Sequence, residues 1–324
     1  MTGGALRRLA GDCRVKRPEE EAWSAGPTMT GDRRDRCPAC GATKPAAVFT
    51  RLEWSRFATT TADSRRDFAK AMQADPDLAF DEFLQCGTCG TVFTDRVPSA
   101  AALGRFYHQY HGNPGYLAKL DRKLALEKRR LFLLKFLTRG RRFLDVGCNI
   151  GCAVEAARWN GFIATGLELD EAAVAIARER FPHNEFVTGT LDAVPPRQQF
   201  DLVYCSEVIE HVPDIGHFVR QLAAHVAPGG VLLLTTPDSG HKQVRDDVLH
   251  WETLRPPEHL TLFTRAGIRA ALAPHFHHVV ILPNAKPGVQ VLAFKGKNCP
   301  DDIGNGGEDI ELGLKHSPAA LESG

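Results

Sequence analysis

Segments typical of β-strands alternate with helical segments between residues 142 and 235, and this order constrains the fold more than any other feature. The expected strands are 142–146, 162–168, 186–187, 200–205 and 231–235, and the expected helices are 152–160, 170–180 and 214–226. Such alternation predicts an α/β fold with a doubly wound, mostly parallel sheet. Two further strands, 279–282 and 289–295, are joined by too few residues for a parallel crossover, so we expect an antiparallel C-terminal hairpin at the sheet edge.

A glycine-bearing turn connects the first strand to its helix. At the carboxyl end of a strand, such a turn forms a ligand crevice lined by backbone N–H groups of a helix N-terminus. The dinucleotide pattern Gly-x-Gly-x-x-Gly is met only at Gly147, whereas the shorter pattern Gly-x-Gly-x-Gly is met at both Gly147 and Gly151. Asn149 replaces the middle glycine and tolerates a left-handed backbone. The turn therefore indicates S-adenosylmethionine rather than NAD as the ligand.

Glu168 ends the second strand, and it follows Gly147 by the spacing that nucleotide sites of doubly wound folds use. A carboxylate at this position can accept hydrogen bonds from both ribose hydroxyls and would repel a 2′-phosphate. The alternative is a polar strand end without a ligand. Together with the glycine turn, the position favours a role in cofactor binding.

Several motifs resemble those of class I S-adenosylmethionine-dependent methyltransferases, in the branch with ubiquinone-pathway O-methyltransferases and small-molecule tailoring enzymes. They are LDVGCNIG at 144–151, GLE at 166–168, FDLVYCSEVIEHV at 200–212, PGG at 228–230 and PPEHLTLF at 256–263. The resemblance implies a Rossmann-like fold and an enzyme that uses S-adenosylmethionine. It also implies cofactor contacts at Asp145, Gly147, Cys148, Asn149, Gly151, Glu168, Leu169, Thr190, Leu191, Ser206 and Glu207. Relatives often carry an acid at the Thr190 position, and Thr190 and Ser206 can equally be ordinary strand ends.

Two Cys-x-x-Cys-Gly sequences precede this region and have the form of zinc knuckles. Their four thiols, Cys37, Cys40, Cys86 and Cys89, would form a closed tetrahedral site, which is typical of a structural zinc ion in a small ribbon-like module. Surface turns with unpaired thiols are the alternative. The insert between the pairs supplies aromatic residues for packing, namely Trp54, Phe57, Phe68 and Phe80.

The partner of this zinc-binding module can be a nucleic acid or a small molecule. A formal net charge of +1 argues against nucleic acid. Some sugar and natural-product methyltransferases, which the chain resembles, have an N-terminal zinc module beside the substrate pocket, followed by a Tyr-rich segment. The corresponding residues 106–116 are FYHQYHGNPGY, and they can form a lid over the substrate or a packed linker helix.

Two motif histidines are candidates for a general base, because the ordinary pKa of histidine is ~6.5. His211 follows the fourth strand, and His259 lies in the Pro-Pro-Glu-His motif. In the sugar C-methyltransferases that the chain resembles, a Glu-His pair at this place removes a proton, which implies the same role for Glu258 and His259. The alternative is that each histidine only binds a backbone carbonyl.

The chain is therefore expected to comprise a disordered segment 1–36, a zinc-binding module 37–100, an aromatic and helical connector and lid 101–139, the cofactor-binding domain 140–298 and an acidic disordered tail 299–324. Met29 is a second possible start. We expect no membrane span, because no apolar run approaches ~20 residues. We also expect a cytoplasmic location, because the N-terminal segment lacks the apolar core of a secretory signal. The leading hypothesis is methyl transfer to a small-molecule acceptor. A nucleic-acid-binding enzyme and a non-catalytic partner protein are the alternatives, and the oligomeric state is open.

Overall fold

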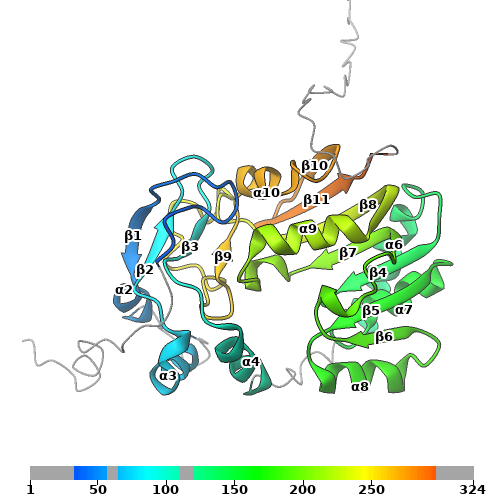
Figure 1. Cartoon of the computed structure of the whole chain (residues 1–324), viewed down its shortest axis with the longest axis horizontal. Coiled ribbons are helices and arrows are strands. Elements are labelled where there is room, and N and C mark those ends of the chain that lie inside the picture. The colour runs from blue at the N-terminus through cyan, green and yellow to red at the C-terminus, as the bar shows by residue number, and fades with distance from the viewer. Residues whose placement is uncertain (1–32, 57–64, 110–119, 297–324) are drawn as a thin grey trace, which may run out of the picture.

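The computed structural model describes residues 33–56, 65–109 and 120–296, and it contains two sheets that lie side by side (Figure 1). The acidic tail, Phe57, residues 110–119 and nearly all of segment 1–36 lie outside the described residues. Among the described helices, none is both long and apolar enough to cross a bilayer.

The larger sheet has seven strands in the order β10-β11-β8-β7-β4-β5-β6. Strands β4 to β8 are mutually parallel, whereas β11 pairs antiparallel with both β8 and β10. Their bounds are β4 Arg142–Val146, β5 Ile163–Glu168, β6 Glu185–Thr188, β7 Phe200–Ser206, β8 Val226–Pro237, β10 His278–Leu282 and β11 Gly288–Phe294. The predicted doubly wound, mostly parallel sheet with an antiparallel C-terminal hairpin is confirmed.

Helices cover both faces of this sheet, because its strands are apolar on both sides. Side chains of α6, α7 and α8 pack with Leu202 and Tyr204 of β7 on one face. Side chains of α9 and α10 pack with Val203 and Cys205 of the same strand on the other face. The alternation along β7 follows from the two-residue period of a strand. The helices are α6 Leu120–Leu134, α7 Cys152–Trp159, α8 Glu171–Arg180, α9 Ile215–His225 and α10 Arg265–Leu272.

The helix ends agree with capping chemistry. Asp170 accepts a hydrogen bond from the backbone N–H of Ala172 at the start of α8, and Asp214 accepts one from His217 at the start of α9. Gly161 follows α7 with a φ of 86°, which a residue without Cβ adopts readily. The predicted helices 152–160, 170–180 and 214–226 are therefore present within one or two residues.

The smaller sheet has the order β1-β2-β3-β9 and is antiparallel throughout. Its first three strands, β1 Ala46–Thr50, β2 Glu82–Gln85 and β3 Val92–Thr94, come from the cysteine-bearing region, and β9 Thr261–Leu262 comes from the segment after β8. Short helices flank it: α2 Arg51–Arg56, α3 Arg65–Ala74, η1 Pro76–Leu78 and α4 Ala100–Gln109. The sheet therefore ties the N-terminal module to the larger domain.

Aromatic residues of the insert form the core of this smaller unit, as the sequence predicted. Trp54, Phe68 and Phe80 are buried, and the indole N–H of Trp54 donates to the carbonyl of Leu254 at 2.8 Å. Leu254, Leu260 and Leu262 belong to the same apolar cluster. The segment after β8 is therefore held by the N-terminal module.

Gly166 lies where β5 passes beneath the turn that follows β4, and it gives a stability test. A Cβ at Gly166 would lie 2.7 Å from Cys148 Sγ and 2.8 Å from a ring carbon of Phe186. We expect Gly166→Ala to lower the free energy of unfolding by ~1–3 kcal/mol through overpacking. Chemical denaturation followed by circular dichroism measures this change.

Gly104 in α4 is the matched control, because a Cβ there would have nothing within 4 Å. Gly104→Ala should raise the free energy of unfolding by ~0.5–1 kcal/mol through helix propensity. Equal stability of the two variants would contradict the close packing at Gly166.

Candidate functional site

The turn after β4 has the backbone that its sequence predicted. Gly147, Asn149 and Gly151 have φ angles of 75°, 49° and 83°. A Cβ at Gly147 would lie 2.4 Å from a methyl group of Val208, and one at Gly151 would lie 2.8 Å from the ring of Phe186. Side chains of neighbouring residues therefore fill the space beside both glycines, and the turn lies close against Val208 and Phe186 at the N-terminus of α7.

Glu168 lies against the same turn. One carboxylate oxygen accepts from the backbone N–H of Asn149 at 2.8 Å, and the other accepts from Leu169 at 2.7 Å and Asp170 at 3.1 Å. The side chain is half-buried, and Leu169 is exposed. The structure thus brings the predicted carboxylate to the glycine turn. Ribose hydroxyls can replace these N–H groups as hydrogen-bond donors to the Glu168 carboxylate.

Asp145 and Cys148 are buried beneath this turn. Burial raises the pKa of Asp145 well above its ordinary value, and the carboxylates of Glu127 and Glu168 raise it further. Glu127 comes from α6 and accepts a hydrogen bond from the hydroxyl of Tyr204 at 3.1 Å. The sequence analysis missed Glu127, because the sequence of α6 does not indicate that the Glu127 side chain faces β4 and β7.

Thr190 and Leu191 follow β6, beside the end of β5. The N–H of Gly189 donates to the carbonyl of Glu168 at 2.8 Å, Leu191 is buried, and Thr190 is exposed. The hydroxyl of Thr190 donates to Asp192 at 3.3 Å. Asp192 thus provides an acid close to the position where relatives often carry one, and the sequence analysis overlooked it.

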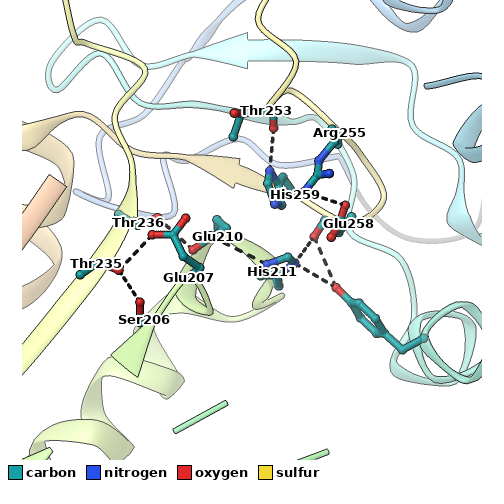
Figure 2. Close-up of polar contacts among 11 residues, drawn as sticks. Ser206, Glu207, Glu210, His211, Thr235, Thr236, Thr253, Arg255, Glu258 and His259 are labelled. Carbon is teal, nitrogen blue, oxygen red and sulfur yellow. Dashed lines mark hydrogen bonds and ion pairs between the residues drawn. The ribbon is translucent and has the colours of Figure 1, made fainter. Parts of the chain in front are cut away.

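Ser206 and Glu207 lie at the end of β7 and share one hydrogen-bonded group (Figure 2). The hydroxyls of Ser206 and Thr235 are 2.7 Å apart, and Thr235 donates to Glu207 at 2.9 Å. Glu207 has a φ of 57°, a backbone that few residues other than glycine adopt. The strand therefore turns sharply here, and η3 Ile209–His211 follows.

The two predicted histidines meet next to this turn. Their ring centroids are 4.7 Å apart, with the planes at 77°. His211 Nδ1 lies 2.8 Å from the carbonyl oxygen of Glu258, and His259 Nδ1 lies 2.6 Å from that of Thr253 (Figure 2). Because a carbonyl oxygen only accepts, each Nδ1 carries the hydrogen, and Nε2 is the free nitrogen of each neutral ring.

Burial keeps both rings neutral. It lowers the pKa of His211 to about 4 and that of His259 well below its ordinary value. The ring of His211 lowers the pKa of His259 further. His259 is 5% exposed, whereas His211 is half-buried.

Glu258 forms an ion pair with Arg255. Its carboxylate lies 3.2 Å from a guanidinium nitrogen of Arg255. The ring of His259 is instead oriented by the carbonyl of Thr253. The motif spacing placed Glu258 next to His259 along the chain, but adjacent residues point in different directions.

Glu210 is the acid that the sequence analysis passed over. It is fully buried, one oxygen accepts from the hydroxyl of Thr236 at 2.9 Å, and the other lies 3.8 Å from His211 Nε2. Burial raises the pKa of Glu210 to about 8, and Glu207 adds to this. Its position next to His211 in the motif was the sequence feature that could have indicated its place in the site.

The aromatic connector reaches this cluster through Tyr107. The hydroxyl of Tyr107 lies 3.3 Å from His211 Nδ1 and donates to the carbonyl of Glu258 at 3.4 Å. Phe106, its neighbour, is buried in the smaller core. The rest of the predicted lid, from Tyr110 to Tyr116, lies outside the described residues.

The four predicted zinc ligands form one cluster. The Sγ atoms of Cys37 and Cys89 are 3.6 Å apart, as are those of Cys40 and Cys86, and all four lie within 4.8 Å of one another. Sulfur atoms around a tetrahedral zinc ion are ~3.8 Å apart, because Zn–S is ~2.3 Å. Gly41 and Gly90 both have a φ of 73° and donate to the first cysteine carbonyl of their knuckle. The donor set therefore fits a structural zinc ion.

Comparison with known proteins is consistent with this geometry. Residues 116–274 match a family described as a methyltransferase domain. The ubiquinone biosynthesis O-methyltransferase of Paramagnetospirillum magneticum is 32% identical over 137 residues, which cover 41% of this chain and 55% of that protein. The enzyme of the same name from Bordetella avium is 40% identical over 103 residues, which cover 30% and 43%. The chain thus spans about half the length of the curated relatives it matches.

A solved structure of an S-adenosylmethionine-dependent methyltransferase from Archaeoglobus fulgidus aligns with a TM-score of 0.45 and 16% identity, over 56% of this chain and 100% of that one. The family match identifies residues 116–274 as a methyltransferase domain.

Proposed function

We propose that this protein transfers a methyl group from S-adenosylmethionine to a hydroxyl group of a small-molecule acceptor. The observation that carries the proposal is the hydrogen bond from the backbone N–H of Asn149 to Glu168, because it places a carboxylate beside the glycine turn at the N-terminus of α7. The names of the relatives support a small-molecule acceptor that is methylated on oxygen.

In this proposal, the residues around the turn bind and orient the cofactor. Glu168 accepts hydrogen bonds from the ribose, the N–H groups of 147–151 face the methionine portion, and Asp145 supports the turn from below. Thr190, Leu191 and Asp192 flank the base. Ser206 and Glu207 lie at the acceptor side of the turn. When bound, the cofactor supplies an electrophilic methyl group on its sulfonium.

His259 removes the proton of the acceptor hydroxyl at Nε2. The carbonyl of Thr253 fixes the hydrogen on Nδ1, so the free nitrogen is available to the acceptor. His211 and Tyr107 border the same place and orient the acceptor. Both histidines also bind backbone carbonyls, which is the alternative role given above. This role is compatible with catalysis, because it uses Nδ1 and leaves Nε2 for the proton.

The proposal assigns a structural zinc ion to Cys37, Cys40, Cys86 and Cys89. The hydroxyl of Thr264, which caps α10, donates to the carbonyl of Cys89, so the second knuckle contacts the methyltransferase domain. The zinc ion thereby stabilises the segment that carries His259. Four reduced thiolates require a reducing compartment, which supports a cytoplasmic location.

The first test concerns the cofactor. Titration calorimetry should show binding of S-adenosylhomocysteine and no binding of NAD. Glu168→Gln should weaken S-adenosylhomocysteine binding by ~1–3 kcal/mol, because a hydrogen bond to a charged group is lost. Glu171→Gln, an exposed acid on the next turn, is the control and should bind normally. Preference for NAD would refute the assignment.

The second test concerns the metal. Elemental analysis of the purified protein should give one zinc ion per chain, and Cys86→Ser should lose it, because a closed site needs all four thiolates. Cys152→Ser, which changes a buried thiol outside the cluster, should retain it. Wild-type protein without stoichiometric zinc, prepared without chelators, would contradict the proposal.

The third test concerns the base. Labelled S-adenosylmethionine and a panel of phenols, catechols and nucleotide-linked sugars identify an acceptor. With that acceptor, His259→Asn should reduce kcat by ~10²–10⁴-fold and keep the affinity for S-adenosylhomocysteine. The amide of asparagine can still donate to Thr253, so a purely structural histidine would tolerate the change.

His225→Asn is the matched control, because His225 is also buried and its Nδ1 also lies 2.8 Å from a backbone carbonyl. It should retain kcat. Unchanged turnover in His259→Asn would show that His259 only holds its loop.

A further inference from the structure

Three potential metal ligands converge between η3 and the segment before β9. They are Glu210, His211 and His259, and one ligand atom of each lies within 4.8 Å of those of the others. Glu210 Oε1 lies 3.8 Å from His211 Nε2. Glu210 is fully buried and His259 is 5% exposed. Figure 2 shows Glu210 and both histidines turned toward a common centre.

The contacts of these three residues with the other described residues indicate which atoms face an ion. Glu210 Oε1 is buried without a hydrogen-bond partner among them, while the other oxygen is held by Thr236. The carbonyls of Glu258 and Thr253 take the Nδ1 hydrogens of the two histidines and so direct both Nε2 lone pairs into the cluster. Metal-binding histidines are oriented by such contacts in most metal sites.

The backbone fixes the arrangement as well. The N–H of Leu260 donates to the carbonyl of Glu210 at 2.8 Å, which joins the segment that carries His259 to the η3 turn that carries Glu210 and His211. The three ligands therefore come from two segments that are held together before any ion binds.

We propose that Glu210, His211 and His259 form a second metal site, which binds a divalent cation of the zinc type. Two imidazoles and one carboxylate suit Zn²⁺ or Co²⁺, whereas Mg²⁺ and Ca²⁺ prefer oxygen ligands. Ligand atoms around a tetrahedral zinc ion are ~3.4 Å apart, so Glu210 Oε1 and His211 Nε2, 3.8 Å apart, are already close to the required separation. A water molecule completes the coordination.

The ion would regulate the enzyme, and this part of the inference rests on the proposed function. A cation bound to His259 Nε2 occupies the nitrogen that would remove the proton from the hydroxyl group to be methylated. Metal binding and proton removal therefore exclude each other, and zinc ions inhibit methyl transfer.

Cobalt distinguishes this site from the thiolate cluster. Zinc-loaded protein is titrated with Co²⁺, and visible absorption is recorded together with the content of both metals. We expect one zinc ion and one cobalt ion per chain, with the weak visible bands of nitrogen- and oxygen-bound Co²⁺ and without the near-ultraviolet bands of Co²⁺ bound to thiolate. His259→Asn and Glu210→Gln should weaken cobalt binding at least tenfold and keep the zinc ion.

His225→Asn is the control and should bind cobalt as the wild type does. Zinc added beyond the first equivalent should then inhibit methyl transfer in the wild type, and a mild chelator should restore the activity. Absence of a cobalt ion per chain, or equal cobalt binding in His259→Asn, would overturn the metal site. Cobalt binding without inhibition would overturn the regulatory role. The titration needs no cofactor or acceptor, so its result is independent of whether methyl transfer is found.

Discussion

The hydrogen bonds between Glu168 and the N–H groups of Asn149 and Leu169 fix the backbone at the carboxyl ends of the central strands of the large sheet. They join the ends of β4 and β5. They depend on a left-handed turn in which Gly147 and Gly151 lack the Cβ atoms that would clash with Val208 and Phe186. Val208 in turn precedes η3, which carries Glu210 and His211. The same packing therefore sets both the glycine turn of the proposed cofactor site and the position of the histidine pair.

The small sheet has a second structural role, because its fourth strand belongs to the segment after β8. Pairing of β3 with β9, the Trp54 contact with Leu254 and the Thr264 contact with the Cys89 knuckle hold this segment from the N-terminal side. On its other side, Leu260 is bonded to Glu210. His259 thus lies between two anchored points, and a module remote in sequence stabilises the proposed proton acceptor.

Local patterns were sufficient to predict most of the large domain. Strand periodicity, caps such as Asp170 and Asp214, and the short link before β11 each act within a few residues, and the repeated spacing of the Cys pairs predicted the cluster. The missed features are long-range. A two-residue strand such as β9 is too short to show a strand period. The residues next to Glu210 and Glu127 in the sequence indicate neither the burial of Glu210 nor the approach of Glu127 to Asp145. The pairing of Glu258 with Arg255 depended on rotamers that spacing does not determine.

The central claim is that the crevice between the glycine turn and Glu168 receives the cofactor. A crystal structure of the protein with S-adenosylhomocysteine tests it most directly. The account predicts both ribose hydroxyls within hydrogen-bond distance of the Glu168 carboxylate, with the amino acid portion over Gly147 to Gly151. A nucleoside bound elsewhere, with Glu168 still bonded to Asn149 and Leu169, would contradict the account.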